Sequence, residues 1–235
     1  MRGSTDLSGI RLDPSFQGRG ITADYVAEGL RNAIQAGDLP DDSVLNQAAI
    51  AAHFGVSRVP VREAMRQLQA EGLIEARAHH LSVVSGLSLD AIEQLYDIRA
   101  LIEGHLIEAA TPHVDARAIA RLRRLERRMR SERNHSRWLE MNAEFHRTLN
   151  SASGNLVGLQ LVDQLKSRAE RYVRMWSGGE GVHRPREAGG EHVEILDLVA
   201  KGDAAGAKDA VERHIRRTGR RLVSYGRELS ASEDG

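Results

Sequence analysis

A glycine at position 55 separates two short helical patterns, and this spacing constrains the fold more than any other feature of the chain. The residues before it have the apolar period of a helix over about 46–54. After it, Ser57 is a suitable N-cap for a second helix. The apolar stripe of that helix is formed by Val61, Ala64, Met65 and Leu68. Because glycine adopts the left-handed backbone of a tight turn, the pattern predicts two helices joined at Gly55.

A further helix precedes this pair, and a β-hairpin follows it. From Thr22, apolar residues recur at helical spacing and stop at Gly37, which is typical of a helix closed by a glycine. Strand-like runs at 73–77 and 81–84 flank Ala78-His79-His80 and predict a hairpin. Three short helices followed by a hairpin indicate a winged helix-turn-helix, whose third helix enters the DNA major groove.

The chain beyond residue 86 has helical periodicity throughout. Gly, Pro, Asn and Ser clusters separate helices expected at about 88–110, 115–133, 136–152, 155–176, 187–201 and 203–228. The predicted fold class is therefore mainly α, with an N-terminal winged helix-turn-helix domain followed by an all-α helical bundle. We expect a flexible arm at 1–18, the winged helix-turn-helix at 19–86, the all-α domain at 87–228 and a flexible tail at 229–235.

Composition narrows the possible chemistry. The 235 residues include no cysteine and ten histidines, so a metal would need nitrogen and oxygen ligands. The chain has neither a long apolar run nor a leader-like apolar segment, and we therefore expect a cytoplasmic protein. The formal net charge is zero, so a DNA-binding surface must concentrate its positive charge locally.

The second helix of the pair carries the residues expected to read DNA. Arg58 and Arg62 are four residues apart and therefore lie on one face, where their guanidinium groups can contact guanine. Val59 can contact a thymine methyl group, and Ser57 lies at the helix N-terminus, which favours a phosphate. The alternative is that these residues only cap and solvate a surface helix. The expected wing contacts are Arg77, His79 and His80.

Residues 44–74 resemble the GntR family of bacterial regulators. The family pattern is Gly-Val-Ser-Arg, then x-Pro-Val-Arg-Glu-Ala and Leu-x-x-Glu-Gly-Leu, and it stands here at residues 55–64 and 68–73. The resemblance implies a transcription regulator, usually a repressor, that binds a palindromic operator in double-stranded DNA as a homodimer. It supports the assignment of Arg58 and Arg62 to DNA binding.

Two positions depart from the family pattern. Gln47 stands where an acidic residue is usual, and Leu81 stands where the wing tip usually has glycine. Because leucine approaches a sugar-phosphate backbone less closely than glycine, the wing contacts are less secure than those of the helix.

Four residues of the predicted all-α domain are candidate metal ligands. Asn142 and His146 are four residues apart and share one helix face, while His192 and His214 border apolar stripes of two later helices. Three imidazoles and one amide oxygen suffice for a divalent ion such as zinc or nickel. The alternative is that these are ordinary histidines at the edge of a core.

The same domain resembles the all-α (FCD) effector domain of the FadR-type branch of the GntR family. The resemblance is carried by residues 97–103, Asp-Ile-Arg-Ala-Leu-Ile-Glu, and by Phe145-His146 followed by Ser153-Gly154-Asn155. It implies a metal held by Asn142, His146, His192 and His214. A neutral Asn in place of Asp should weaken that site.

The expected effector is a small carboxylate that binds the open position of the metal and an arginine, for which Arg99 is the candidate. Arg99 can instead be a structural partner of Glu103, four residues later. A metal sensor, in which the ion itself is the signal, is one alternative function. A metal-dependent enzyme is another, but the ligand shell has no carboxylate placed as a general base, although Glu144 and Glu191 are near in sequence. We therefore expect no catalytic residues.

Overall fold

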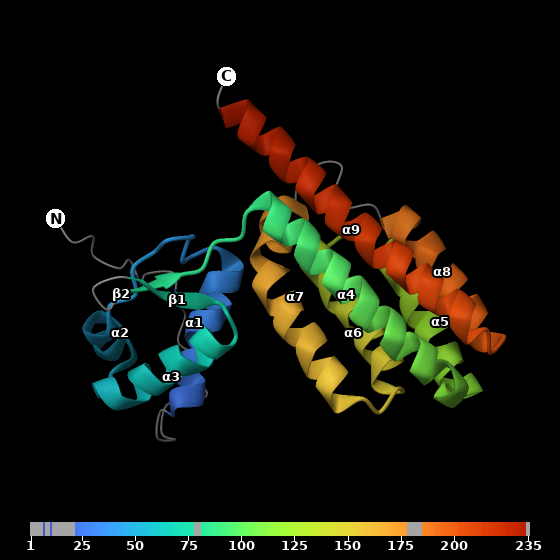
Figure 1. Ribbon diagram of the computed structural model, residues 1–235, viewed down its shortest axis with the longest axis horizontal. Helices are drawn as coiled ribbons and strands as arrows, with labels where there is room; N and C mark the ends of the chain where they lie inside the picture. Colours follow the sequence, from blue (N-terminus) through green and yellow to red (C-terminus); the bar gives the residue numbers. More distant parts are fainter. Residues whose placement is uncertain (1–6, 8–9, 11–21, 78–80, 178–184, 234–235) are drawn as a thin grey trace. The chain divides into compact units, whose positions relative to one another are not determined.

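The structure is a computed structural model that describes residues 7, 10, 22–77, 81–177 and 185–233 (Figure 1). By its internal contacts the chain divides into two units. The first comprises Met1–Leu87 with Lys166–Met175, and the second comprises Ser88–Leu165 with Trp176–Gly235. Each unit is described by itself.

The first unit contains the predicted winged helix-turn-helix. Its elements are α1 (Ala23–Ala36), α2 (Gln47–Phe54), α3 (Arg58–Ala70), β1 (Ile74–Arg77) and β2 (Leu81–Val84). Gly55 ends α2 with a φ of 67°, which confirms the tight turn before α3. Asn46 caps the start of α2 by accepting hydrogen bonds from the backbone N–H groups of Ala48 and Ala49. Local capping therefore sets where α2 and α3 meet.

The wing is an antiparallel hairpin in which Ile74 pairs with Val84 and Arg77 with Leu81. Val44 forms an isolated bridge to Val83, which ties the segment before α2 to the wing. The predicted wing contacts His79 and His80 lie outside the described residues. The hairpin itself confirms the predicted wing.

The core of the first unit is apolar and includes two residues from the predicted flexible arm. Leu7 and Ile10 are buried in the same cluster as Phe54. The carbonyl oxygen of Ile10 also lies 3.1 Å from Nε2 of His53. At these two positions the prediction of a flexible arm is wrong, because each residue finds apolar surface to cover. The rest of the 1–18 segment lies outside the described residues.

Helices make up the second part of the chain, as predicted. They are α4 (Leu89–Ala110), the short 3-10 helix η3 (Thr111–His113), α5 (Ala116–Ser131), α6 (His135–Ser151), α7 (Leu156–Ser177), α8 (Pro185–Ala200) and α9 (Ala204–Glu233). The segment 229–233, predicted as a tail, belongs to α9, because it contains no residue that breaks a helix. Residues 234–235 lie outside the described part. No helix within the described residues is long and apolar enough to cross a membrane.

Helices α4 and α9 lie side by side in the second unit (Figure 1). Gly219 of α9 faces Tyr96 of α4 so closely that a Cβ added to the glycine would lie 2.4 Å from Cβ of Tyr96. A separation this short requires one of the two helices to move. Glycine at 219 therefore permits the close approach of α4 to α9, the helix that carries His214 five residues earlier.

We predict that Gly219→Ala lowers the free energy of unfolding by about 1–3 kcal/mol, because steric overlap outweighs the better helix propensity of alanine. Gly190→Ala is the matched control, since Gly190 is an exposed helical glycine with no atom within 4 Å of an added Cβ. The control should be neutral or stabilising by up to about 1 kcal/mol. Urea unfolding measures both, and equal stability of the two variants would contradict the close helix approach.

Candidate DNA-binding helix and metal centre

Helix α3 has one buried face and one exposed face. Val61, Ala64, Met65 and Leu68 are buried in the core of the first unit. Arg58 and Arg62 are exposed on the other face, and Val59 is 63% exposed. A valine this exposed at the start of a helix does not contribute to the core. The packing therefore presents the predicted base-reading residues to solvent.

The two arginines on this face are not neutralised by neighbouring carboxylates. Within the described ranges, neither Arg58 nor Arg62 forms an ion pair, whereas Arg66 lies 3.5 Å from Glu63. Ser57 occupies the N-cap position of α3, but its side chain makes no capping hydrogen bond. The exposed end of α3 thus offers two guanidinium groups and a hydroxyl for DNA.

Arg77, the arginine predicted to contact DNA from the wing, pairs with neighbouring carboxylates. The Nε of Arg77 donates to Glu75 at 2.6 Å, and its Nη2 donates to Asp42 at 2.5 Å. Leu81 is paired with Arg77 across the hairpin and is 43% exposed. The two carboxylates compete with a phosphate for the guanidinium of Arg77, so the wing contact stays a prediction.

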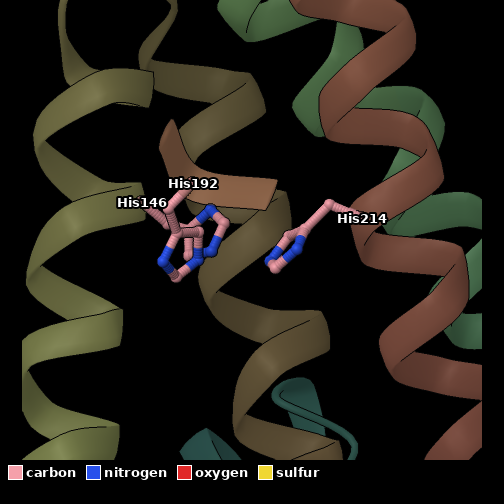
Figure 2. Close-up of side chains that lie close together, drawn as sticks. All are labelled: His146, His192 and His214. Atoms are coloured by element: carbon pink, nitrogen blue, oxygen red, sulfur yellow. The ribbon is translucent and has the colours of Figure 1, made fainter. Parts of the chain in front are cut away.

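Three histidines converge within the second unit (Figure 2). His146 comes from α6, His192 from α8 and His214 from α9. One ring nitrogen of each lies within 4.8 Å of the others. The ring centroids are 5.4 Å apart for His146 and His192, 5.1 Å for His146 and His214, and 4.9 Å for His192 and His214. The histidines that the family resemblance implied as ligands therefore lie together.

The donor atoms fit a bound cation. His192 is fully buried, and neither of its ring nitrogens has a hydrogen-bond partner within the described residues. Oδ1 of Asn142, one turn before His146 on α6, is also buried without a partner there. Buried polar atoms are normally satisfied, so these atoms point to a ligand that accepts their lone pairs. Nitrogen and oxygen donors of this kind suit zinc or nickel.

Burial keeps His192 neutral. Removal from water, and then electrostatic interactions with His214, His146 and Arg130, hold the pKa of His192 well below the ordinary value of 6.5. A neutral imidazole has a free lone pair, which is the form that binds a metal.

A carboxylate contacts the third histidine. Oε2 of Glu191 on α8 lies 2.7 Å from Nδ1 of His214, and Nη1 of Arg217 donates to Oε1 of the same carboxylate at 2.8 Å. Burial alone would raise the pKa of Glu191, but its hydrogen bond with His214 and its electrostatic interactions with His214, Arg217 and Arg221 bring that pKa below its ordinary value. Glu191 is therefore an ionised partner of His214.

Arg99, the candidate effector arginine, is buried and paired with Glu103. Its Nε and Nη2 both donate to Oε1 of Glu103, at 3.0 and 2.7 Å. The other oxygen of Glu103 accepts from Asn150 at 3.0 Å and lies 3.8 Å from Nδ1 of His146. This is the structural pairing that the i, i+4 spacing allowed. A role for Arg99 in effector binding stays a prediction.

Sequence reasoning did not assign a role to Glu191 toward His214, or to Asn150 beside Glu103. Glu191 directly precedes His192, yet its side chain contacts His214, which is 23 residues later. Asn150 lies on α6 and contacts Glu103 on α4, 47 residues earlier in the chain. Contacts between different helices need the tertiary structure.

The winged helix-turn-helix, with two exposed arginines on its third helix, and the helical domain with a buried histidine cluster define a DNA-binding transcription regulator. The FCD domain family matches residues 94–217, and the family described as bacterial regulatory proteins, gntR family, matches residues 22–80. The chain therefore belongs to the GntR family of bacterial regulators and carries an FCD domain. These domains are those of regulators and not of enzymes.

Relatives and solved structures agree with this assignment. The chain is 28% identical over 191 residues to an HTH-type transcriptional regulator in an unstable DNA locus of Streptomyces ambofaciens, covering 80% of this chain and 79% of that protein. It is 40% identical over 103 residues to the gluconate operon transcriptional repressor of Bacillus subtilis, covering 44% and 42%. The structure of E. coli McbR/YncC shares the fold, with a TM-score of 0.70 at 17% identity over 85% of this chain and 96% of that one.

The lowered pKa of His192 makes the stability of the metal-free protein depend on pH. Below pH 6.5 the unfolded chain gains a proton at this position that the folded chain does not, so the free energy of unfolding falls as the pH falls. The contribution of one such group is at most about 1.4 kcal/mol per pH unit. Urea unfolding in chelator between about pH 5.5 and 7.5 measures this slope.

His192→Gln should give a shallower slope, and His105→Gln, at an exposed position on α4, should leave it unchanged. A slope in His192→Gln as steep as that of the parent would contradict the prediction.

Proposed function

We propose that this regulator represses transcription in the bacterial cytoplasm as a homodimer on a palindromic operator. A small carboxylate effector, bound in the FCD domain with a divalent metal, controls its operator affinity. The observation that carries the proposal is the convergence of His146, His192 and His214, together with buried ring nitrogens of His192 and a buried Oδ1 of Asn142 that have no hydrogen-bond partner among the described residues. Asn142, His146, His192 and His214 would hold the ion.

The proposed DNA contact uses α3. Arg58 and Arg62 are exposed and not ion-paired within the described residues, so their guanidinium groups are available to the O6 and N7 acceptors of guanine. A homodimer places two such helices at two half-sites, which is why a palindromic operator is expected. Ser57 and Val59 add a phosphate contact and an apolar contact at the same end of the helix.

The proposed effector chemistry follows from the donor set. A zinc or nickel ion with four protein ligands or fewer keeps room for an anionic oxygen, and it supplies the positive charge that attracts a carboxylate. One relative is named for a gluconate operon, and gluconate is a small carboxylate. Because Asn142 is neutral, the protein ligands leave the charge of the ion uncompensated, and this favours an anionic effector.

Control of DNA binding needs an effector that binds two states of the protein with different affinity. A carboxylate that prefers the state with weaker operator binding shifts the population toward release of DNA, and by linkage operator DNA lowers the affinity for the carboxylate. We propose this coupling as the regulatory mechanism.

The metal itself can be the signal, and the same histidine cluster supports this second candidate. In that case the ion changes operator affinity without any carboxylate. Enzymatic turnover has no support, since the matched domains are regulatory. Glu144 is exposed and pairs with Arg121 at 2.6 Å, and Glu191 is held by His214 and Arg217, so neither carboxylate is placed as a free base.

We predict that Arg58→Ala and Arg62→Ala each weaken specific operator binding by about 1–3 kcal/mol, the value of a bidentate contact to a base. Fluorescence anisotropy with operator and with unrelated DNA measures the change. Arg121→Ala in α5 is the control, because it removes an exposed arginine from outside the winged helix. Unchanged operator affinity in both α3 variants would remove the DNA-reading role.

The metal and effector roles are tested in two steps, of which the first measures the metal content of the purified protein. Protein purified without chelator should contain about one zinc or nickel ion per chain, and His146→Ala/His192→Ala should contain almost none. His105→Ala, at an exposed position, should keep the metal. Equal metal content in the parent and the double variant would contradict the proposed site.

Operator binding is then titrated with the metal alone and with the metal plus a panel of small carboxylic acids. A response only when both are present supports the carboxylate regulator, and the response should disappear in the double variant. A response to the ion alone supports the metal sensor instead.

A further inference from the structure

We propose that Glu191 is a positioning residue that fixes His214 with its Nε2 lone pair available to the metal. The inference rests on the proposed metal site and assigns to it a residue that is not itself a ligand. The geometry points to this role because Glu191 lies on α8, directly before the ligand His192, while its side chain contacts His214 on α9. Helix α8 thus supplies one ligand and orients another.

The contact between Glu191 and His214 is short and mostly shielded from water. Oε2 of the carboxylate lies 2.7 Å from Nδ1 of the imidazole, and the two side chains are 18% and 5% exposed. Oε1 of Glu191 accepts from Arg217, which follows His214 by three residues on α9. Both carboxylate oxygens of Glu191 therefore contact residues of α9. These two contacts fix the orientation of the Glu191 side chain, and this in turn fixes the ring of His214.

A neutral imidazole carries one proton, and its position decides which nitrogen can bind a metal. A carboxylate accepts a hydrogen bond and does not donate one when ionised, so Glu191 keeps the proton of neutral His214 on Nδ1. Nε2 then has the free lone pair. Metal-bound histidines commonly donate their second N–H to a carboxylate, which fixes the ring and raises its basicity.

Glu191 also supplies charge that the ligand set lacks. The ligands are three neutral histidines and the neutral amide of Asn142, so none of them carries a negative charge. The ionised carboxylate of Glu191 contacts Nδ1 of His214, so an ion held by Nε2 of that ring would lie one imidazole away from it. We therefore expect Glu191 to strengthen metal binding without touching the metal.

A nearby ion pair on the same two helices provides a matched control. Glu194 on α8 pairs with Arg213 on α9 at 2.7 Å, but both side chains are more than half exposed, and no hydrogen bond joins either side chain to the histidine cluster in the described structure. Glu194→Ala therefore removes a carboxylate between α8 and α9 without removing a partner of a ligand.

The first measurement reads the tautomer of His214 in metal-free protein at about pH 8, where a free imidazole is neutral. Long-range ¹H–¹⁵N spectra of ¹⁵N-histidine-labelled protein, with His214 assigned by its loss in His214→Gln, should show the Nδ1–H form. Glu191→Ala should shift His214 toward the Nε2–H form, and Glu194→Ala should not. An Nε2–H form in the parent, or no change in Glu191→Ala, overturns the proposal.

The second measurement is zinc affinity by competition with a chromophoric chelator. Glu191→Ala should lower the affinity about 10–100-fold, the usual effect of removing such a partner. Glu191→Gln should lose less affinity than Glu191→Ala, because its amide oxygen still accepts the Nδ1 proton although the negative charge is gone. Equal losses in the Ala and Gln variants, or no loss in either, would overturn the positioning role. Circular dichroism and thermal unfolding confirm that each variant is folded.

The two measurements separate this inference from the metal site itself. If the parent protein binds no zinc and no nickel, the proposed metal function fails, while the tautomer of His214 still decides whether Glu191 positions the ring. If the parent binds zinc and the tautomer is unchanged in Glu191→Ala, the positioning role alone fails.

Discussion

The burial of neutral imidazole nitrogens is the constraint on which the FCD domain depends. His192 is removed from water with both ring nitrogens unpartnered in the described structure, and a buried donor or acceptor without a partner costs about 1–3 kcal/mol. A bound ion would offset this cost, since any ligand of the folded state adds stability that grows with its concentration. In the proposed metal site, α6, α8 and α9 each bring one histidine to the cluster, so ion binding would stabilise the domain as well as carry the signal.

Much of the fold follows from local signals. The turn at Gly55, the cap at Asn46 and the breaks between the later helices depend on residues close in sequence, so their positions were predictable. The C-terminal end of α9 was not predictable, because the segment 229–233 has no strong apolar period. Leu7 and Ile10 were also missed, since two isolated apolar residues in a polar segment give no periodic signal.

The candidate site was only partly predictable. Spacing placed Asn142 and His146 on one face, but the association of His146 with His192 and His214 came from family resemblance, because no local rule connects three helices. The contact of Glu191 with His214 was invisible for the same reason. The sequence also could not show which arginines pair with carboxylates. In the described part Arg58 and Arg62 form no ion pair, whereas Arg77 pairs with Glu75 and Asp42.

The order of the histidines along the chain has a consequence for how the regulator is made. The helix that reads DNA ends at Ala70, whereas the last of the three histidines stands at position 214 on α9. During synthesis the winged helix is therefore complete more than a hundred residues before the cluster can form. A nascent or truncated chain that lacks α9 retains the arginines for DNA but has no complete histidine cluster. Such a product would have the helix proposed to read DNA without the complete cluster proposed to receive the signal.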